Sequence, residues 1–346
     1  MKYTQLGKTE IEVSRICLGT MTFGEQNSEA EGHEQMDYAL SQGVNFIDTA
    51  EMYSVPGRKE TQGSTERIIG TWLNARKNRD KIILASKIAG PSDRFSYMRN
   101  PMKFNKEQIH EALNNSLKRL QTDYLDLYQL HWPERRTNYF GQRGFMPSKS
   151  DSWEDNFEEV LEVLQDLIKE GKIRHIGLSN ETPWGLNRCL NLAENKGLPK
   201  VVSVQNPYSL LNRTYEIGMA EISYREKVGL LAYSPMAFGL LSGKYHTDKP
   251  PGEGRIKRYP VMARYNSKNC YEATEAYMKI AEEEGISVAK LSLAFVNSRE
   301  FLTSNIIGAT TMEQLKENIE SIEVELSKEA LKAIEGVHAR IPDPAP

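Results

Sequence analysis

The chain has 346 residues, 39% of them hydrophobic, and its 44 Lys and Arg nearly balance 47 Asp and Glu, for a net charge of −3. This balance argues against a nucleic-acid-binding protein, which needs a clustered basic excess. No apolar stretch approaches the roughly 18 residues of a membrane span, and the N-terminus has no apolar segment typical of a secretory signal. We therefore expect a cytoplasmic protein that binds neither nucleic acid nor a membrane.

The predicted elements alternate between short apolar runs and longer helical segments. An N-terminal hairpin is expected to pair residues 3–6 with 13–16. The eight predicted strands that follow span 16–20, 45–50, 81–88, 125–132, 173–180, 201–206, 230–236 and 305–310. Several are continuously apolar, as expected for parallel strands that are covered on both faces.

Helix signals lie between the predicted strands. Asn105 can cap a helix with a regular apolar stripe, and Gln108 stands at the third helical position of a capping box. Ser64 can cap an earlier helix, and Gly171 stands where a later one would end. Eight strands, each followed by a helix, predict one closed (β/α)8 TIM barrel over 1–346, although the length alone would also allow two domains.

Two predicted connections are long: 133–155 follows the fourth strand and 237–268 follows the seventh. We interpret both as lids, because loops of this length are usually functional or disordered and barrel enzymes build their sites at the C-terminal ends of strands. Arg135 and Arg136 in the first loop could meet an anion, but a solvated basic pair is the simpler interpretation. The Pro-rich tail 341–346 is expected to be extended and, being short, to leave the site open.

Four polar residues are predicted to converge on the barrel mouth. Asp48, Lys87 and His131 stand at the ends of the second, third and fourth strands, and Tyr53 follows Asp48 in the loop above. A free tyrosine has a pKa near 10, but a neighbouring ammonium favours the phenolate and lowers that pKa. A carboxylate would hold the lysine charged, and a histidine could bind a substrate carbonyl. Such a set can make Tyr53 a general acid.

Each of the four residues also has an ordinary structural explanation. Asp48 can cap the following turn, and Lys87 can pair with any carboxylate at the rim. His131 can be a core imidazole, and Tyr53 a loop aromatic. The four together at one barrel mouth favour a catalytic interpretation over four unrelated roles.

Cysteine and histidine usage argues against a disulfide framework and a metal site. Cys17, Cys189 and Cys270 are odd in number, far apart and free of any CxxC motif. The six histidines include no HExxH motif, and no GxGxxG supports a Rossmann site. No metal is expected.

Several segments together resemble the aldo-keto reductases over nearly the whole chain. They are GVNFIDTAEMY (43–53), LASK (84–87), LDLYQLHWP (125–133), IRHIGLSN (173–180), VQNPYSLLNR (204–213), AYSPMAFGLLSGKY (232–245) and IIGATTMEQLKENI (306–319). MTFGEQNSEA (21–30) and the long 133–155 loop resemble most the bacterial Tas-like branch, which is related to potassium-channel β-subunits.

The resemblance implies an NADPH-dependent reductase of aldehydes or ketones, with a small-molecule carbonyl compound as substrate. It implies that Tyr53 donates the proton and that Asp48, Lys87 and His131 complete a catalytic tetrad. The residues it implies for binding NADP(H) are Gly19, Thr20, Met21, Ser179, Asn180, Gln205, Tyr233, Ser234, Pro235, Met236, Gly239, Leu241, Ser242, Lys244, Thr310, Gln314, Glu317 and Asn318. Many aldo-keto reductases carry basic residues after the eighth strand that bind the 2′-phosphate of NADP, and this sequence lacks them there. The resemblance therefore implies a lid arginine for the 2′-phosphate: Arg255, with Arg258 and Arg264 as alternatives.

Two other functions stay open from the sequence. One is a regulatory module that binds NADP(H) tightly, turns over slowly and signals redox state to a partner. The other is a phosphate-handling barrel enzyme without redox chemistry.

Overall fold

The structure is a computed structural model that describes residues 1–247, 254, 256 and 264–346. Eight parallel strands close into a barrel in the order β10-β3-β4-β5-β6-β7-β8-β9. Their bounds are β3 Ile16–Gly19, β4 Phe46–Asp48, β5 Ile83–Ile88, β6 Leu125–Leu130, β7 Ile173–Ser179, β8 Val201–Pro207, β9 Gly229–Tyr233 and β10 Leu302–Ile307. The predicted closed barrel is confirmed, with each strand found inside or within three residues of its predicted range.

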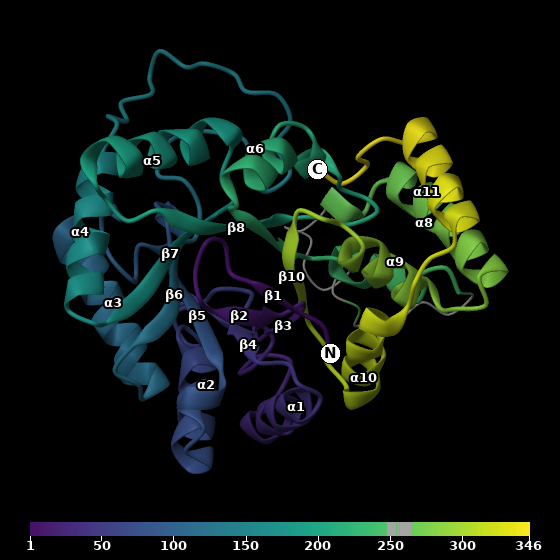
Figure 1. Ribbon diagram of the computed structural model, residues 1–346, viewed down its shortest axis with the longest axis horizontal. Helices are drawn as coiled ribbons and strands as arrows, with labels where there is room; N and C mark the ends of the chain where they lie inside the picture. Colours follow the sequence, from purple (N-terminus) through teal and green to yellow (C-terminus); the bar gives the residue numbers. More distant parts are fainter. Residues whose placement is uncertain (248–253, 255, 257–263) are drawn as a thin grey trace.

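A hairpin of β1 (Tyr3–Gln5) and β2 (Glu12–Ser14) lies across the barrel at the end where the strands begin (Figure 1). Leu6 and Val13 from this hairpin are fully buried and share an apolar cluster with Cys17 and Phe46 of the barrel strands. The hairpin therefore closes the bottom of the barrel, as predicted, and leaves the opposite end for a site.

Helices surround the strands (Figure 1). Their bounds are α1 Glu29–Ser41, α2 Ser64–Arg76, α3 Lys106–Leu120, α4 Phe157–Lys169, α5 Pro183–Lys196, α6 Met219–Glu226, α8 Lys268–Glu283, α9 Val288–Asn297, α10 Met312–Glu320 and α11 Lys328–Arg340. The apolar stripe of α3, including Ile109 and Leu113, is fully buried with Leu84 of β5 in the main core. Burial of each such side chain contributes roughly 1.5–3 kcal/mol, so the strand pattern and the helix stripe stabilise one another.

The helix starts differ in detail from the predicted caps. Asn105 accepts a hydrogen bond from the Gln108 amide at 3.0 Å, as predicted. The Gln108 side chain instead bonds the Lys103 amide and the Pro101 carbonyl, so no reciprocal capping box forms. The prediction for Ser64 is wrong: α2 starts after Gly63, whose left-handed φ of 74° suits glycine, and Ser64 is the first helical residue.

The C-terminal tail packs against the barrel and does not extend away from it. The Ala345 amide donates to the Leu211 carbonyl at 3.0 Å, and Ala345 is fully buried. Asp343 accepts a hydrogen bond from the Arg213 backbone amide at 2.5 Å. These bonds hold the tail against the loop that follows β8, and the tail does not line the cavity that contains Tyr53.

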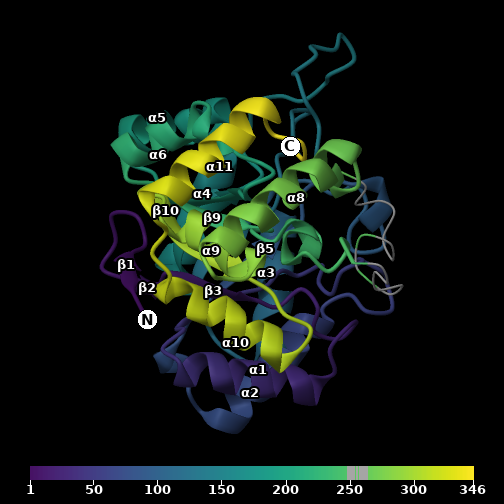
Figure 2. The same cartoon turned by 90° about the vertical axis from the view of Figure 1, so that its right-hand side faces the viewer.

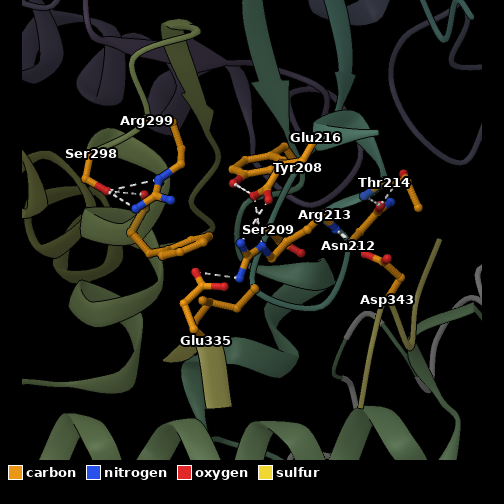
Figure 3. A network of polar contacts seen from close by, with 12 residues as sticks. Tyr208, Ser209, Asn212, Arg213, Thr214, Glu216, Ser298, Arg299, Glu335 and Asp343 are labelled. Atoms are coloured by element: carbon orange, nitrogen blue, oxygen red, sulfur yellow. Dashed lines mark hydrogen bonds and ion pairs between the residues drawn. The ribbon is translucent and has the colours of Figure 1, made fainter. Parts of the chain in front are cut away.

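Arg213 also links that loop to the last helix (Figure 3). Its guanidinium donates to both carboxylate oxygens of Glu216 at 2.8 Å and lies 2.9 Å from Oε1 of Glu335 in α11. The Tyr208 hydroxyl donates to Glu216 at 2.5 Å. The segment 208–216 and α11, which are distant in the sequence, thus share one ionic cluster.

The loop between β6 and α4 projects beyond the body of the barrel in both ribbon views (Figure 2). The connection after β9 begins with a short 3₁₀ segment, η4 (Ala237–Ser242), and its later residues lie partly outside the described ranges. Within the described residues, no helix is long and apolar enough to cross a membrane.

Candidate active site

A cavity of about 800 Å³ opens at the C-terminal ends of the barrel strands. Its lining includes Asp48 and Tyr53, from β4 and the loop after it, and His131, which follows β6. Lys87 lies beneath them with no exposed surface. The structure therefore brings together the four residues that the sequence placed at one barrel mouth.

Lys87 and Asp48 form a buried ion pair at the floor of this cavity. Lys87 Nζ lies 2.6 Å from Asp48 Oδ2 and donates to the Thr49 carbonyl at 2.7 Å. The other carboxylate oxygen of Asp48 accepts hydrogen bonds from Gln205 at 2.8 Å and Gln129 at 3.2 Å. Burial would lower the pKa of Lys87, but Asp48 and Tyr53 outweigh it and hold that pKa above its usual value. Lys87 is therefore a fixed cation.

Tyr53 lies directly above this cation. Its ring centre is 4.9 Å from Lys87 Nζ. Burial raises the pKa of Tyr53, and the Lys87 charge lowers it without cancelling that rise. The sequence argument named only the lowering effect. The net result is a protonated phenol at neutral pH, which can donate a proton.

His131 is held neutral beside Tyr53. The two rings meet edge to face with centres 5.7 Å apart, and His131 lies just after β6. Burial, followed by the Lys87 charge, holds the pKa of His131 well below its usual value. Its Nδ1 has no hydrogen-bond partner among the described residues. A neutral imidazole can therefore bind a carbonyl oxygen without competing as a proton source.

A second set of polar side chains lines the cavity on the β7–β9 side. The Tyr233 hydroxyl donates to Asn180 Oδ1 at 2.6 Å, and Asn180 Nδ2 donates to the His131 carbonyl at 2.8 Å. The Ser179 hydroxyl donates to the Gln205 carbonyl at 2.8 Å. These bonds join the side chains at the strand ends to the tetrad, so a ligand bound here would be fixed relative to Tyr53.

Comparisons with known proteins agree with this geometry. A family model described as "Aldo/keto reductase family" matches residues 15–339. The chain belongs to the aldo/keto reductase family. It is 49% identical to the protein tas of Escherichia coli over the full length of both chains. It is 34% identical to the uncharacterized oxidoreductase YrpG of Bacillus subtilis, covering 97% of this chain and 96% of YrpG, and 40% identical to an aldo-keto reductase of Babesia bovis, covering 69% and 88%.

The chain is thus a Tas-like aldo/keto reductase, an enzyme of an oxidoreductase family whose members typically use a nicotinamide cofactor. The cavity side nearest Tyr233 fits such a group. Gly308 and Gly19 both line it, and a Cβ on Gly308 would find only the Gly19 carbonyl within 4 Å. Ser179, Asn180 and Gln205 add the donors and acceptors that a carboxamide requires.

Backbone strain marks the same side of the aldo/keto reductase barrel. Asn180, Ser234, Ala237 and Phe238 have φ between 46° and 56°, in the left-handed region that most residues avoid. Gly239 follows with φ of 92°, and a Cβ there would be 3.0 Å from Lys244 Nζ. Strained residues persist mainly at functional sites. This turn lies beside the Lys244 ammonium, a group that can bind phosphate.

The residues implied for the cofactor fall into two groups in this aldo/keto reductase. Eight line the cavity: Gly19, Thr20, Met21, Ser179, Asn180, Gln205, Tyr233 and Ser234. Ten lie outside its lining: Pro235, Met236, Gly239, Leu241, Ser242, Lys244, Thr310, Gln314, Glu317 and Asn318. The Leu241 side chain is fully buried in the core, so only its backbone could meet a ligand.

The residues implied for the adenosine end form their own hydrogen bonds around α10. Gln314 Oε1 accepts from the Thr310 amide at 3.0 Å, and Asn318 Nδ2 donates to the Gly308 carbonyl at 3.2 Å. Glu317 accepts from the Ser287 hydroxyl at 2.5 Å, which ties α10 to the start of α9. The glutamine, asparagine and glutamate are thus clustered next to the cavity wall at Gly308.

Of the three lid arginines considered for the 2′-phosphate, the structure describes one. Arg255 and Arg258 lie outside the described residues. Arg264 is described, and it lines the cavity beside Tyr233.

Arg135 is not the solvated residue that the sequence suggested. It is buried, and its guanidinium pairs with Glu181 and donates to the Thr182 hydroxyl at 3.0 Å. The rings of Phe157 and Trp184 lie 5.4 and 4.9 Å from the guanidinium carbon. Arg135 therefore anchors the start of the long loop, whereas Arg136 is exposed.

Sequence reasoning missed a second buried ion pair behind the tetrad. Glu51 accepts hydrogen bonds from Arg99 at 2.8 Å and from the Ala89 amide at 2.7 Å. Because Glu51 stands two residues before Tyr53, this pair ties the tyrosine loop to the loop after β5. The signal available was an acidic residue inside the apolar segment that carries Asp48 and Tyr53.

Proposed function

We propose that this enzyme reduces aldehydes or ketones to alcohols with NADPH, and that Tyr53 donates the proton. The observation that carries the proposal is the protonated Tyr53 phenol held above the buried Lys87–Asp48 pair in a cavity large enough for a cofactor ring and a substrate. The bound nicotinamide supplies a hydride to the carbonyl carbon.

The chain's own residues would act on the carbonyl oxygen. His131 is neutral and would hold that oxygen by a hydrogen bond. Tyr53 would transfer its hydroxyl proton to the same oxygen as negative charge develops there. Lys87 would stabilise the phenolate that remains, and Asp48 keeps Lys87 charged and in place. General acid catalysis of this kind contributes about 10²–10⁴-fold.

The preference for NADPH over NADH depends on the arginine proposed for the 2′-phosphate. Lys244 beside the Gly239 turn and the Thr310–Gln314 pair at the start of α10 support a dinucleotide that lies from β9 toward α10. The arginine proposed for the 2′-phosphate, Arg255, lies outside the described residues. Its substitution by Gln should weaken the binding of NADPH more than that of NADH.

The test follows absorbance decay of NADPH and, separately, NADH with a panel of aromatic and aliphatic aldehydes. Wild type should consume NADPH steadily. Tyr53→Phe should bind NADPH as tightly, measured by quenching of protein fluorescence, while its kcat falls about 10²–10⁴-fold. Tyr224→Phe, an exposed tyrosine on α6, is the matched control. Tight binding of NADPH without turnover would contradict the proposed reductase activity and favour the redox-sensing module.

A further inference from the structure

The cavity has an aromatic wall and two arginines among its described lining residues: Arg94, which is exposed, and Arg264. Phe95, Trp132, Tyr139 and Phe140 form the aromatic wall. Such a wall favours a substrate with an apolar or aromatic body. Arg264 also lines this cavity, and it lines a second cavity of about 480 Å³ between the long loop, the end of β8 and the C-terminal tail. Arg264 thus stands where the two spaces meet.

The stem of Arg264 is held in place by its neighbours. A Cβ on Gly141 would be 3.4 Å from the Cβ and Cδ of Arg264, so the long loop packs against the aliphatic part of the side chain. The guanidinium carbon lies 4.9 Å above the Tyr265 ring, and that ring packs against Phe238. The guanidinium is therefore preorganised, and a ligand would not need to order it.

Unlike Lys87, Arg99 and Arg135, the partly buried Arg264 has no acidic partner among the described residues. Lys87 pairs with Asp48, Arg99 with Glu51, and Arg135 with Glu181. The groups beside Arg264 are the phenols of Tyr233 and Tyr265, and its Nη1 is buried without a hydrogen-bond partner among the described residues. A buried polar group without a partner costs free energy, which a ligand that satisfies it would recover.

The position of Arg264 does not suit the adenosine end of a dinucleotide. It shares a cavity with Tyr53 and His131, whereas Thr310 and Gln314 line neither cavity. A guanidinium that lacks an acidic partner among the described residues also matches the single charge of a carboxylate better than a phosphate dianion, and its planar fork fits carboxylate geometry.

We propose that Arg264 binds a carboxylate on the substrate, so that the enzyme prefers aldehydes or ketones that combine an apolar or aromatic body with a carboxylate. This inference rests on the proposed carbonyl reduction. It makes Arg264 a residue that determines specificity and leaves the chemical step to the tetrad.

The test compares pairs of substrates that differ only in charge: 3- and 4-carboxybenzaldehyde against 3- and 4-carbamoylbenzaldehyde. Wild type should show a kcat/KM about 10- to 100-fold higher for at least one acid than for its amide, the range expected for a charge-assisted hydrogen bond. Arg264→Gln should abolish that ratio by raising KM for the acid, with the amide little changed. Arg264→Lys should restore part of it. The control is Arg136→Gln, at an exposed arginine of the loop between β6 and α4, and it should leave the ratio as in wild type.

A binding measurement separates this inference from the proposed function. Benzoate, titrated into wild type by calorimetry in the presence of NADP⁺, should bind, and Arg264→Gln should lose that binding. Reduction of the amides without any preference for the acids, or a preference retained in Arg264→Gln, would overturn the role of Arg264 while the reductase stands. A variant that selectively weakens NADPH relative to NADH would assign Arg264 to the cofactor and also overturn it. No reduction of any aldehyde would instead remove the proposed function.

Discussion

Lys87 Nζ lies 2.6 Å from Asp48 Oδ2, and neither side chain has more than 3% of its surface exposed. A buried pair of this kind adds little net stability by itself, because both ions lose their hydration. Loss of one partner is costly because the other charge stays buried alone. The Lys87–Asp48 pair therefore links the stability of the barrel to Tyr53, the proposed acid at the barrel mouth.

Asp48→Asn should lower the free energy of unfolding by about 3–5 kcal/mol, since it leaves the Lys87 ammonium buried without its counter-ion. The double variant Asp48→Asn/Lys87→Met should recover part of that loss, because it removes the uncompensated charge. Urea denaturation followed by circular dichroism measures both. Equal stabilities of wild type and Asp48→Asn would show that the pair is not buried as described.

The rate of carbonyl reduction should be constant between about pH 7 and 9 and fall above pH 10. Burial raises the pKa of Tyr53 above its usual value near 10, so its proton is fully present below that pH and is lost as the pH rises through the raised value. Rate profiles with a neutral aldehyde measure this dependence. A decline beginning near pH 7 would mean that a group with a lower pKa is the acid.

Stability should fall on the acidic side of pH 6.5 partly through His131. Burial and the Lys87 charge depress the pKa of His131 in the folded state. As the pH falls below about 6.5, the unfolded chain therefore binds a proton at His131 while the folded protein does not. The stabilisation is present above pH 6.5 and is lost as the pH falls through the depressed value. His131→Gln should therefore lose less stability than wild type between pH 6.5 and 5, measured as the shift in Tm.

Substitutions of Arg213 and Glu335 should lower the free energy of unfolding by different amounts, although the two residues form one ion pair. Arg213 is buried and also bonds Glu216, so Arg213→Ala should cost about 2–3 kcal/mol. Glu335 is half exposed, with 53% of its side chain accessible, so Glu335→Gln should cost less than about 1 kcal/mol. Chemical denaturation measures both free energies of unfolding. Similar losses for the two variants would contradict the claim that the buried Arg213 contributes more than the half-exposed Glu335.

Removal of residues 343–346 should lower Tm and open the second cavity. The deletion removes the bonds from Arg213 to Asp343 and from Ala345 to Leu211, and it removes two residues that line that cavity. We expect a loss of about 1–3 kcal/mol, because two backbone groups lose partners. Differential scanning calorimetry measures it, with the single substitution Asp343→Asn as the control that keeps the tail.

Local sequence patterns determined the barrel and the four residues at its mouth. Continuous apolar runs mark strands covered on both faces, and regular apolar stripes such as that from Ile109 to Leu120 mark the helices that cover them. Since parallel strands end at the same rim, Asp48, Lys87 and His131 had to meet there once the strand order was known.

The tertiary structure decided what depends on burial and on contacts between distant segments. The sign of the shift in the pKa of Tyr53 follows from a competition between desolvation and the Lys87 charge, which spacing cannot resolve. Arg135 and Arg264 are both arginines in long loops, yet one meets Glu181 and the other faces a cavity beside two phenols. The tail packs against the loop after β8 because Leu211 and Arg213, more than 100 residues earlier, satisfy its polar groups. Hydrogen-bond partners and desolvation are properties of the folded neighbourhood, and for these residues only the folded chain specifies them.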